Sequence, residues 1–292
     1  MNFIDLTNTG TTEETTTNPS PENEVKETEF DLVRASWITM TSLLIFIFGM
    51  LGNVTTVYIY TRSRELRHKK VFELILAAFD IYALCVLLPI FSFDLYTNEG
   101  LSLYFSLAIS LCAHSYHITI LCCTICRYIA IYRPFSFNIF FAKWRMRFVY
   151  IIMAATVYFC ARSLVLRAVL KVKPFGLYLV DIFVLTFTSF VLIAVLFILI
   201  IAKIMKQNKV GPQAAVQDGG TRKKHLIAVK TFGAVSLYFL ISYFSAFMAA
   251  NGVIPLAALY LYFLNHICNP VIYLFLNREF RGKVQEIFTQ AQ

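Results

Sequence analysis

Seven long apolar segments recur along the chain, and they exclude most ways in which it could fold. They cover approximately residues 36–61, 71–93, 101–131, 148–170, 176–202, 228–250 and 254–276. Each is longer than the ~20 residues that an α-helix needs to cross the hydrocarbon of a bilayer. Their polarity does not alternate as in the strands of a membrane barrel, and helices satisfy their own backbone hydrogen bonds in lipid. We therefore predict an all-α membrane protein, a seven-transmembrane helix bundle over residues 36–276.

Composition and charge support a membrane location. Only 15% of the residues are charged and 58% are hydrophobic, whereas about a quarter of a soluble domain is charged. A net charge of +9 would be compatible with binding to nucleic acid, but 20 of the 26 basic residues fall in alternate connecting regions. The positive-inside rule then predicts a multi-pass membrane protein with its N-terminus outside and its C-terminus in the cytosol. The basic regions are predicted to contact membrane lipid and not nucleic acid.

The two ends of the chain differ from its apolar middle. Residues 1–35 are rich in Thr, Glu and Asn, which predicts a disordered extracellular tail. Residues 277–292 follow the last apolar segment, and apolar residues recur there at helical spacing with basic residues between them, at Phe280, Val284, Ile287 and Phe288. This pattern predicts a short amphipathic eighth helix on the inner membrane surface, followed by a short cytoplasmic tail.

Polar residues inside two apolar segments are candidates for function. Asp80 lies in the second segment, and a charge at membrane depth costs roughly 2.5 kcal/mol or more. The last segment contains Asn265, Asn269, Pro270 and Tyr273. Pro270 interrupts the backbone hydrogen bonds of its helix, and the two asparagines can supply replacement partners. A lone acid and a proline-broken helix indicate either a protein that changes shape or, as the alternative, a transporter or channel with Asp80 in its ion path.

Four short motifs follow one another in an order that identifies a family resemblance. They are Gly52-Asn53, the run Leu76-Ala77-Ala78-Phe79-Asp80, Cys126-Arg127-Tyr128, and Asn269-Pro270-Val271-Ile272-Tyr273. Each motif alone is weak, but together, in the first, second, third and seventh apolar segments, the chain resembles the rhodopsin-like G-protein-coupled receptors over about residues 36–288. The resemblance implies a receptor that transmits an extracellular signal to a heterotrimeric G protein.

The resemblance also implies roles for individual residues. Arg127 and Tyr128 would hold the resting state and then contact the G protein, while Pro270 lets the helix bend and Tyr273 packs inward on activation. Cys126 stands where the family has an aspartate. The resemblance therefore implies that one local restraint on Arg127 is lost and that resting activity is higher.

A polar core is the second feature that the resemblance implies. Asp80, Asn53, Asn265 and Asn269 occupy its positions, which in the family often hold a sodium ion. Tyr116 stands where the family's third helix would contribute a small hydroxyl group, and its bulk argues against sodium. No other cofactor and no metal site is expected.

Several departures mark this chain as a divergent member. It lacks the cysteines of the family's stapling disulfide, the proline of the fifth helix and the Cys-Trp-x-Pro hinge of the sixth. The outer third helix has no acid for an amine, and the seventh has no lysine for retinal, which leaves a peptide or another non-amine ligand. One deep acid does not provide the paired carboxylates of an intramembrane protease, so we do not expect an enzyme. The ligand and the G-protein subtype are not specified by the sequence.

Overall fold

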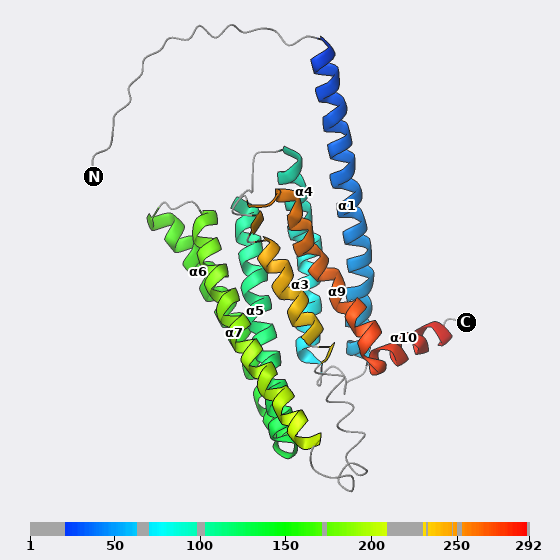
Figure 1. Cartoon of the computed structure of the whole chain (residues 1–292), viewed down its shortest axis with the longest axis vertical. Helices are drawn as coiled ribbons and strands as arrows, with labels where there is room; N and C mark the ends of the chain where they lie inside the picture. The colour runs from blue at the N-terminus through cyan, green and yellow to red at the C-terminus, as the bar shows by residue number, and fades with distance from the viewer. Residues whose placement is uncertain are drawn as a thin grey trace. The chain divides into compact units, whose positions relative to one another are not determined.

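The computed structural model is nearly all helical. It describes residues 21–62, 70–97, 103–170, 174–208, 230–231, 233–246, 248–249 and 253–290, and these ranges contain no strand. The elements, in part shown in Figure 1, are α1 (Pro21–Arg62), α3 (Val71–Tyr82), η1 (Ala83–Leu87), α4 (Leu88–Thr97), α5 (Leu103–Tyr132), α6 (Pro134–Leu170), α7 (Pro174–Asn208), the helix Gly233–Ala246, η2 (Leu256–Leu259), α9 (Tyr260–Leu276) and α10 (Arg278–Gln290). η1 is a π-helical turn and η2 is a 3₁₀ turn.

The chain divides into two compact units, Met1–Trp37 and Ile38–Gln292. In the first unit, the prediction of a disordered tail over residues 1–35 is wrong from residue 21 onward, because α1 begins at Pro21. Proline is favoured at the first helical position, and the following residues are rich in glutamate, a good helix former. Residues 1–20 lie outside the described residues. The second unit contains the packed helices of the chain.

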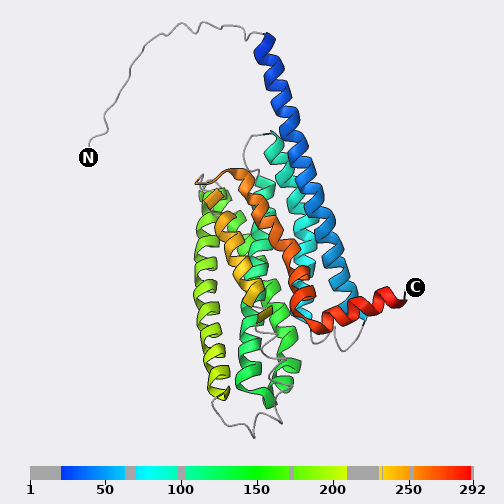
Figure 2. The ribbon, with the colours of Figure 1, turned by 45° about the vertical axis from the view of Figure 1, so that its right-hand side comes forward.

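α5 is packed among the other helices of this unit. It contacts α3, η1, α6 and α7, and Figures 1 and 2 show it between the α3–α4 segment and the α6–α7 pair. Small and medium-sized residues on α5, such as Cys112, Ala113 and Ile120, are fully buried and allow this close approach. α5 therefore places its side chains at the centre of the packing.

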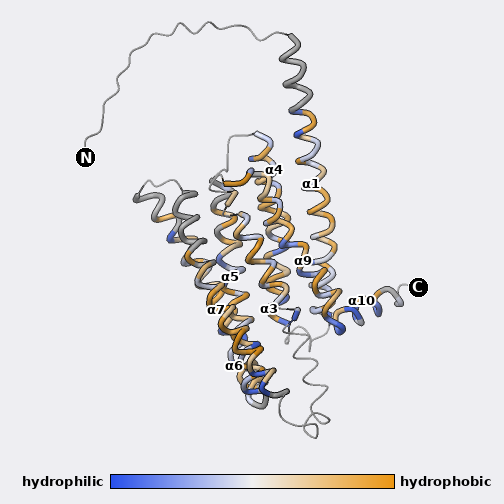
Figure 3. Tube along the Cα trace, in the orientation of Figure 1, coloured by the Kyte–Doolittle hydropathy of each residue, from blue (hydrophilic) through white to orange (hydrophobic). Residues whose placement is uncertain are grey.

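Four of the described helices are long and apolar enough to cross a membrane. They contain the spans Asp31–Arg62, Val71–Thr97, Leu107–Tyr132 and Ala257–Leu276, and two shorter apolar helices cover Phe187–Lys203 and Gly233–Ala246. Figure 3 shows apolar residues along most of the length of these helices and many hydrophilic residues on α10. Large apolar side chains are also exposed along them, which suits contact with lipid. The described residues therefore have the character of a helical membrane protein.

α6 begins earlier than the predicted apolar segment at 148–170. It starts at Pro134, and four aromatic residues of the added turns pack against the main core, namely Phe137, Phe140, Phe141 and Trp144. The prediction relied on hydropathy, which Lys143, Arg145 and Arg147 reduce in this part of the helix. Their burial against α3, for example Phe141 against Phe72 with ring centroids 6.1 Å apart, is what extends the helix.

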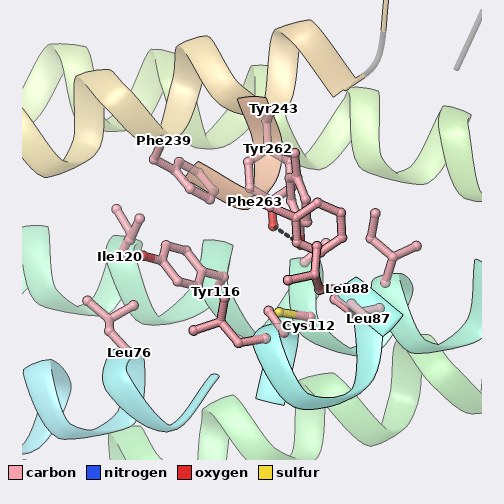
Figure 4. Close-up of a cluster of buried hydrophobic side chains, with 14 of the residues drawn as sticks. Leu76, Leu87, Leu88, Cys112, Tyr116, Ile120, Phe239, Tyr243, Tyr262 and Phe263 are labelled. Carbon is pink, nitrogen blue, oxygen red and sulfur yellow. Dashed lines mark hydrogen bonds between the residues drawn. The ribbon is translucent and has the colours of Figure 1, made fainter. Parts of the chain in front are cut away.

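Aromatic side chains fill the centre of the core. Tyr116 of α5, Phe239 and Tyr243 of the helix Gly233–Ala246, and Tyr262 and Phe263 of α9 converge there, as Figure 4 shows. The hydroxyl groups of Tyr243 and Tyr262 are 3.4 Å apart and hydrogen-bonded. Residues far apart in sequence are thus joined around α5.

α10 is the helix predicted after residue 277. Asn277 ends α9, and its side-chain oxygen accepts hydrogen bonds from the backbone N–H groups of Glu279 and Phe280, at 3.1 and 3.2 Å. The chain then turns, so that α10 leaves the direction of α9 (Figures 1 and 2). Phe280 is buried and Val284 and Ile287 are half-buried, in agreement with the predicted apolar face; the side chain of Phe288 lies outside the described ones.

Candidate functional site

A buried polar cluster surrounds Asp80 of α3. The imidazole Nδ1 of His266 lies 2.7 Å from one carboxylate oxygen of Asp80, and Asn269 Nδ2 donates to the other oxygen at 2.8 Å. Two acceptors would repel at 2.7 Å, so a proton lies between His266 and Asp80. Asp80 and His266 are both 0% exposed, and such a hydrogen bond between a carboxylate and an imidazole is strong in an environment without water. The cluster therefore ties α3 to α9.

Tyr116 closes this cluster from α5. Its hydroxyl oxygen accepts a second hydrogen bond from Asn269 Nδ2. Its ring stacks on Phe239, with centroids 5.1 Å apart, and meets the His266 ring edge-on at 5.8 Å. α3, α5, α9 and the helix Gly233–Ala246 thus meet around one carboxylate, and a displacement of any of them disturbs the same hydrogen bonds.

A sodium ion does not fit the groups around Asp80. A hard cation needs several oxygen ligands, such as carboxylates, carbonyls or water. Both oxygens of Asp80 instead face hydrogen-bond donors, from His266 and Asn269, and the Tyr116 hydroxyl also points to Asn269. His266 supplies a donor to an oxygen of Asp80 that an ion would otherwise need as a ligand.

Asn53 of α1 repairs the backbone defect that Pro270 creates in α9. Proline has no N–H, so the carbonyl of His266, one turn earlier, has no helical donor. Asn53 Nδ2 donates to this carbonyl at 2.7 Å and also to Gly49 of its own helix at 3.0 Å. Gly52 provides the space, because a Cβ atom there would lie 2.8 Å from Cβ of Pro270. The pair Gly52-Asn53 therefore serves the proline of a helix more than 200 residues away in sequence.

We expect Gly52→Ala to destabilise the protein by about 1 kcal/mol, because the added methyl group overlaps the Pro270 ring. Gly282→Ala in α10 is the matched control. A Cβ there meets nothing within 4 Å, so the variant should be unchanged or more stable by about 0.5–1 kcal/mol. Thermal unfolding of the two purified variants in detergent measures the difference. Equal melting temperatures would contradict the close approach of α1 and α9.

The structure does not bring all the predicted polar residues together. Asn265 is buried at 1% exposure, but its side chain makes no hydrogen bond to Asp80. It lies one residue before His266, and it is His266 whose ring reaches the carboxylate. Tyr273 packs edge-on against Phe280, with ring centroids 5.9 Å apart, in a separate apolar cluster with Ile59 and Tyr60.

Arg127 of α5 forms a second polar site together with α3. Its Nη2 lies 3.2 Å from Oε1 of Glu73, and the same oxygen is 3.4 Å from Nζ of Lys70. We expected Arg127 to be less restrained because Cys126 replaces the family's neighbouring acid. Cys126 itself supplies no acid, but Glu73 supplies a carboxylate to Arg127 from another helix.

Tyr128 points to different neighbours from those of Arg127. Its ring stacks on Tyr132 with centroids 4.3 Å apart, and both pack against the buried residues Ile131 and Ile200. The Tyr132 hydroxyl donates to the carbonyl of Leu199 at 3.0 Å. Adjacent residues of one motif thus connect α5 to α3 through Arg127 and to α7 through Tyr128.

Two important residues were missed by sequence reasoning, although signals for both were present. His266 is a polar residue at membrane depth, three positions before Asn269, which places the two on one helical face. Glu73 lies seven residues before Asp80, two turns away on the same face. Both are ionisable residues inside apolar segments, which marks them as candidates in the sequence, but the sequence does not identify their partners.

Comparison of the sequence with protein-family models gives no match, and comparison with curated proteins gives none either. Any assignment of function therefore depends on the residues described above and on the motif resemblance.

Proposed function

We propose that this protein is a plasma-membrane receptor of the rhodopsin-like, G-protein-coupled kind. Its seven predicted segments would form a seven-helix bundle, with the N-terminus outside, the C-terminus in the cytosol and α10 on the inner membrane surface. It would transmit the signal of an extracellular peptide or other non-amine ligand to a heterotrimeric G protein. The ligand's differential affinity for two states of the bundle would shift their populations.

One observation carries this proposal: three of the four motifs converge at the proline-broken part of α9. Asp80 bonds to Asn269, and Asn53 bonds to the carbonyl that Pro270 leaves free. Such mutual dependence explains why these residue types occur together in one chain. Proline removes a backbone hydrogen bond and allows a helix to bend, and the neighbouring side chains satisfy the group that it frees. We propose that the switch uses a bend of α9 at this point.

Arg127 supplies the proposed link to the G protein. It is the charged residue of the remaining motif, Cys126-Arg127-Tyr128, and its side chain is 32% exposed, so part of it is accessible from outside the core. Displacement of α9 or of the helix Gly233–Ala246 would be felt at α5 through Tyr116. The proposal is that this displacement frees Arg127 to contact the G protein.

The alternative of an ion path through Asp80 gains no support from the described residues. Both carboxylate oxygens are engaged and the side chain is 0% exposed. We therefore advance no second function.

Ligand-free activation of G proteins in cells that express the chain tests the proposal. We expect basal activation above that of untransfected cells, and we expect Arg127→Ala to reduce it to background at equal surface expression. Arg145→Ala is the control, since it removes a cation of the same predicted cytoplasmic face outside the four motifs. No activation of any G-protein subtype by surface-expressed protein would count against coupling, and equal loss in both variants would show a general charge effect.

A further inference from the structure

The ion pair between Glu73 and Arg127 is a connection between helices. It joins Glu73 in the first turn of α3 to Arg127 near the end of α5, and the two residues are 54 positions apart. Lys70, the residue that precedes α3, contacts the same carboxylate oxygen of Glu73. The Glu73 side chain is only 12% exposed, so its charge is largely removed from water and depends on these two cations.

A second pair in the chain provides a comparison. Lys283 and Glu286 of α10 lie 2.7 Å apart, but their side chains are 42% and 56% exposed and both belong to one helix turn. Exposed pairs of this kind contribute little, because water and salt compete with them. The Glu73–Arg127 pair is longer but more enclosed and restrains two helices against each other. The same Glu→Gln substitution can therefore be compared in the two pairs. It removes a contact between two helices in one pair and an exposed contact within a single helix in the other.

We propose that Glu73 is a positioning residue that holds Arg127 against α3 and keeps the neighbouring part of α5 closed to water. Release of this pair would let Arg127 turn away from α3 and water enter beside it. A regulatory consequence follows, and it rests on the proposed receptor function. In such a receptor, Glu73 replaces the acid missing at Cys126 and sets the resting activity. The physical restraint itself does not depend on that function.

Two cysteines of the chain are built-in reporters of this opening. Cys123 and Cys126 precede Arg127 on α5 by four residues and one residue, and they are 3% and 4% exposed. Cys112 lies nearer the start of the same helix and is 0% exposed. A water-soluble thiol reagent reaches a buried cysteine only when water does, so its rate of modification reports local opening.

The experiment compares thiol modification in Glu73→Gln, Arg127→Gln and the unaltered full-length protein, purified in detergent and analysed by mass spectrometry. We expect modification of Cys123 and Cys126 to be about fivefold faster in each variant, as for the loss of one partly screened ion pair. Cys112 should be unchanged, which shows that the variant remains folded. The double variant should be no faster than either single one, because both remove the same interaction.

Glu286→Gln is the matched control and should leave all three rates unchanged. Equal rates at Cys123 and Cys126 in Glu73→Gln and the unaltered protein would overturn the proposal. So would a fivefold increase in Glu286→Gln, or additive effects in the double variant. Faster modification of Cys112 as well would mean that the variant is generally unfolded. Arg127→Gln then decides the question. Faster modification of Cys123 and Cys126 alone in that variant would support the restraint, and its absence would overturn the restraint.

Signalling distinguishes failure of this inference from failure of the proposed function. Faster modification with no G-protein activation in any variant would support the restraint and contradict the receptor assignment. Arg127-dependent activation with unchanged modification in Glu73→Gln would support the receptor and overturn the restraint. If both hold, basal activation should also rise about fivefold in Glu73→Gln and stay unchanged in Glu286→Gln.

Discussion

His266→Leu is expected to lower the free energy of unfolding by about 3–5 kcal/mol, because it leaves the Asp80 carboxylate buried without the hydrogen-bond donor of His266. The ring of His266 is 0% exposed and lies 2.7 Å from the carboxylate, so water cannot replace the lost contact without opening the core. Thermal unfolding of the protein in detergent, followed by circular dichroism, measures the effect. His117→Leu is the matched control: this histidine is equally buried, and its Nδ1 contacts the backbone carbonyl of Ala113 in its own helix.

Removal of the charge from the other side should reverse most of this loss. Asp80→Asn in the His266→Leu background removes the unpaired charge and keeps an amide beside Asn269. We expect the double variant to unfold at a higher temperature than His266→Leu alone, since replacement of both members of a buried pair is often close to neutral. A double variant less stable than His266→Leu, or a His117→Leu variant as unstable as His266→Leu, would contradict a special Asp80–His266 interaction.

Asn53→Leu is expected to destabilise the protein by about 2–3 kcal/mol, because the buried carbonyl of His266 loses its donor. The cost should depend on Pro270, whose missing N–H creates the need for Asn53. In a Pro270→Ala background the new backbone N–H can bond to this carbonyl, and Asn53→Leu should then cost about 1–2 kcal/mol less. A four-member cycle of melting temperatures gives this coupling.

Thr56→Val is the control for that cycle. Thr56 is also 0% exposed and lies on the same helix, but its hydroxyl donates to Gly52 of α1 and makes no bond to α9. Its effect should be the same whether residue 270 is proline or alanine. If Asn53→Leu were equally costly in both backgrounds, the view that Asn53 compensates for the proline would be wrong.

Several of the predicted site residues lie close together in the structure, but the sequence did not indicate all of their partners. Asp80, Asn53, Asn269 and Pro270 could be chosen from the sequence because a polar residue or a proline is costly inside an apolar helix. Asn265 was chosen by the same reasoning but does not bond to Asp80, whereas its neighbour His266 does. Adjacent residues of a helix point about 100° apart, and hydropathy alone does not say which of them faces α3.

The restraint on Arg127 shows the same limit. The sequence shows that Cys126 is not an acid, and a local search for a replacement finds none next to it. Glu73 is 54 residues away and reaches Arg127 only because α3 and α5 pack side by side. A motif describes neighbours along the chain, whereas the energy of a charge depends on neighbours in space.

The sequence by itself determined the helical, membrane-compatible character of this protein, the approximate limits of the four apolar helices that are long enough to cross a membrane, and the amphipathic helix that follows Asn277. These properties follow from hydrophobicity and periodicity, which are local along a chain. Only the tertiary structure decided that His266 pairs with Asp80, that Asn53 serves the carbonyl freed by Pro270, and that Glu73 holds Arg127. The physical reason is that a buried polar group must find its partner in three dimensions, on whichever helix packs against it.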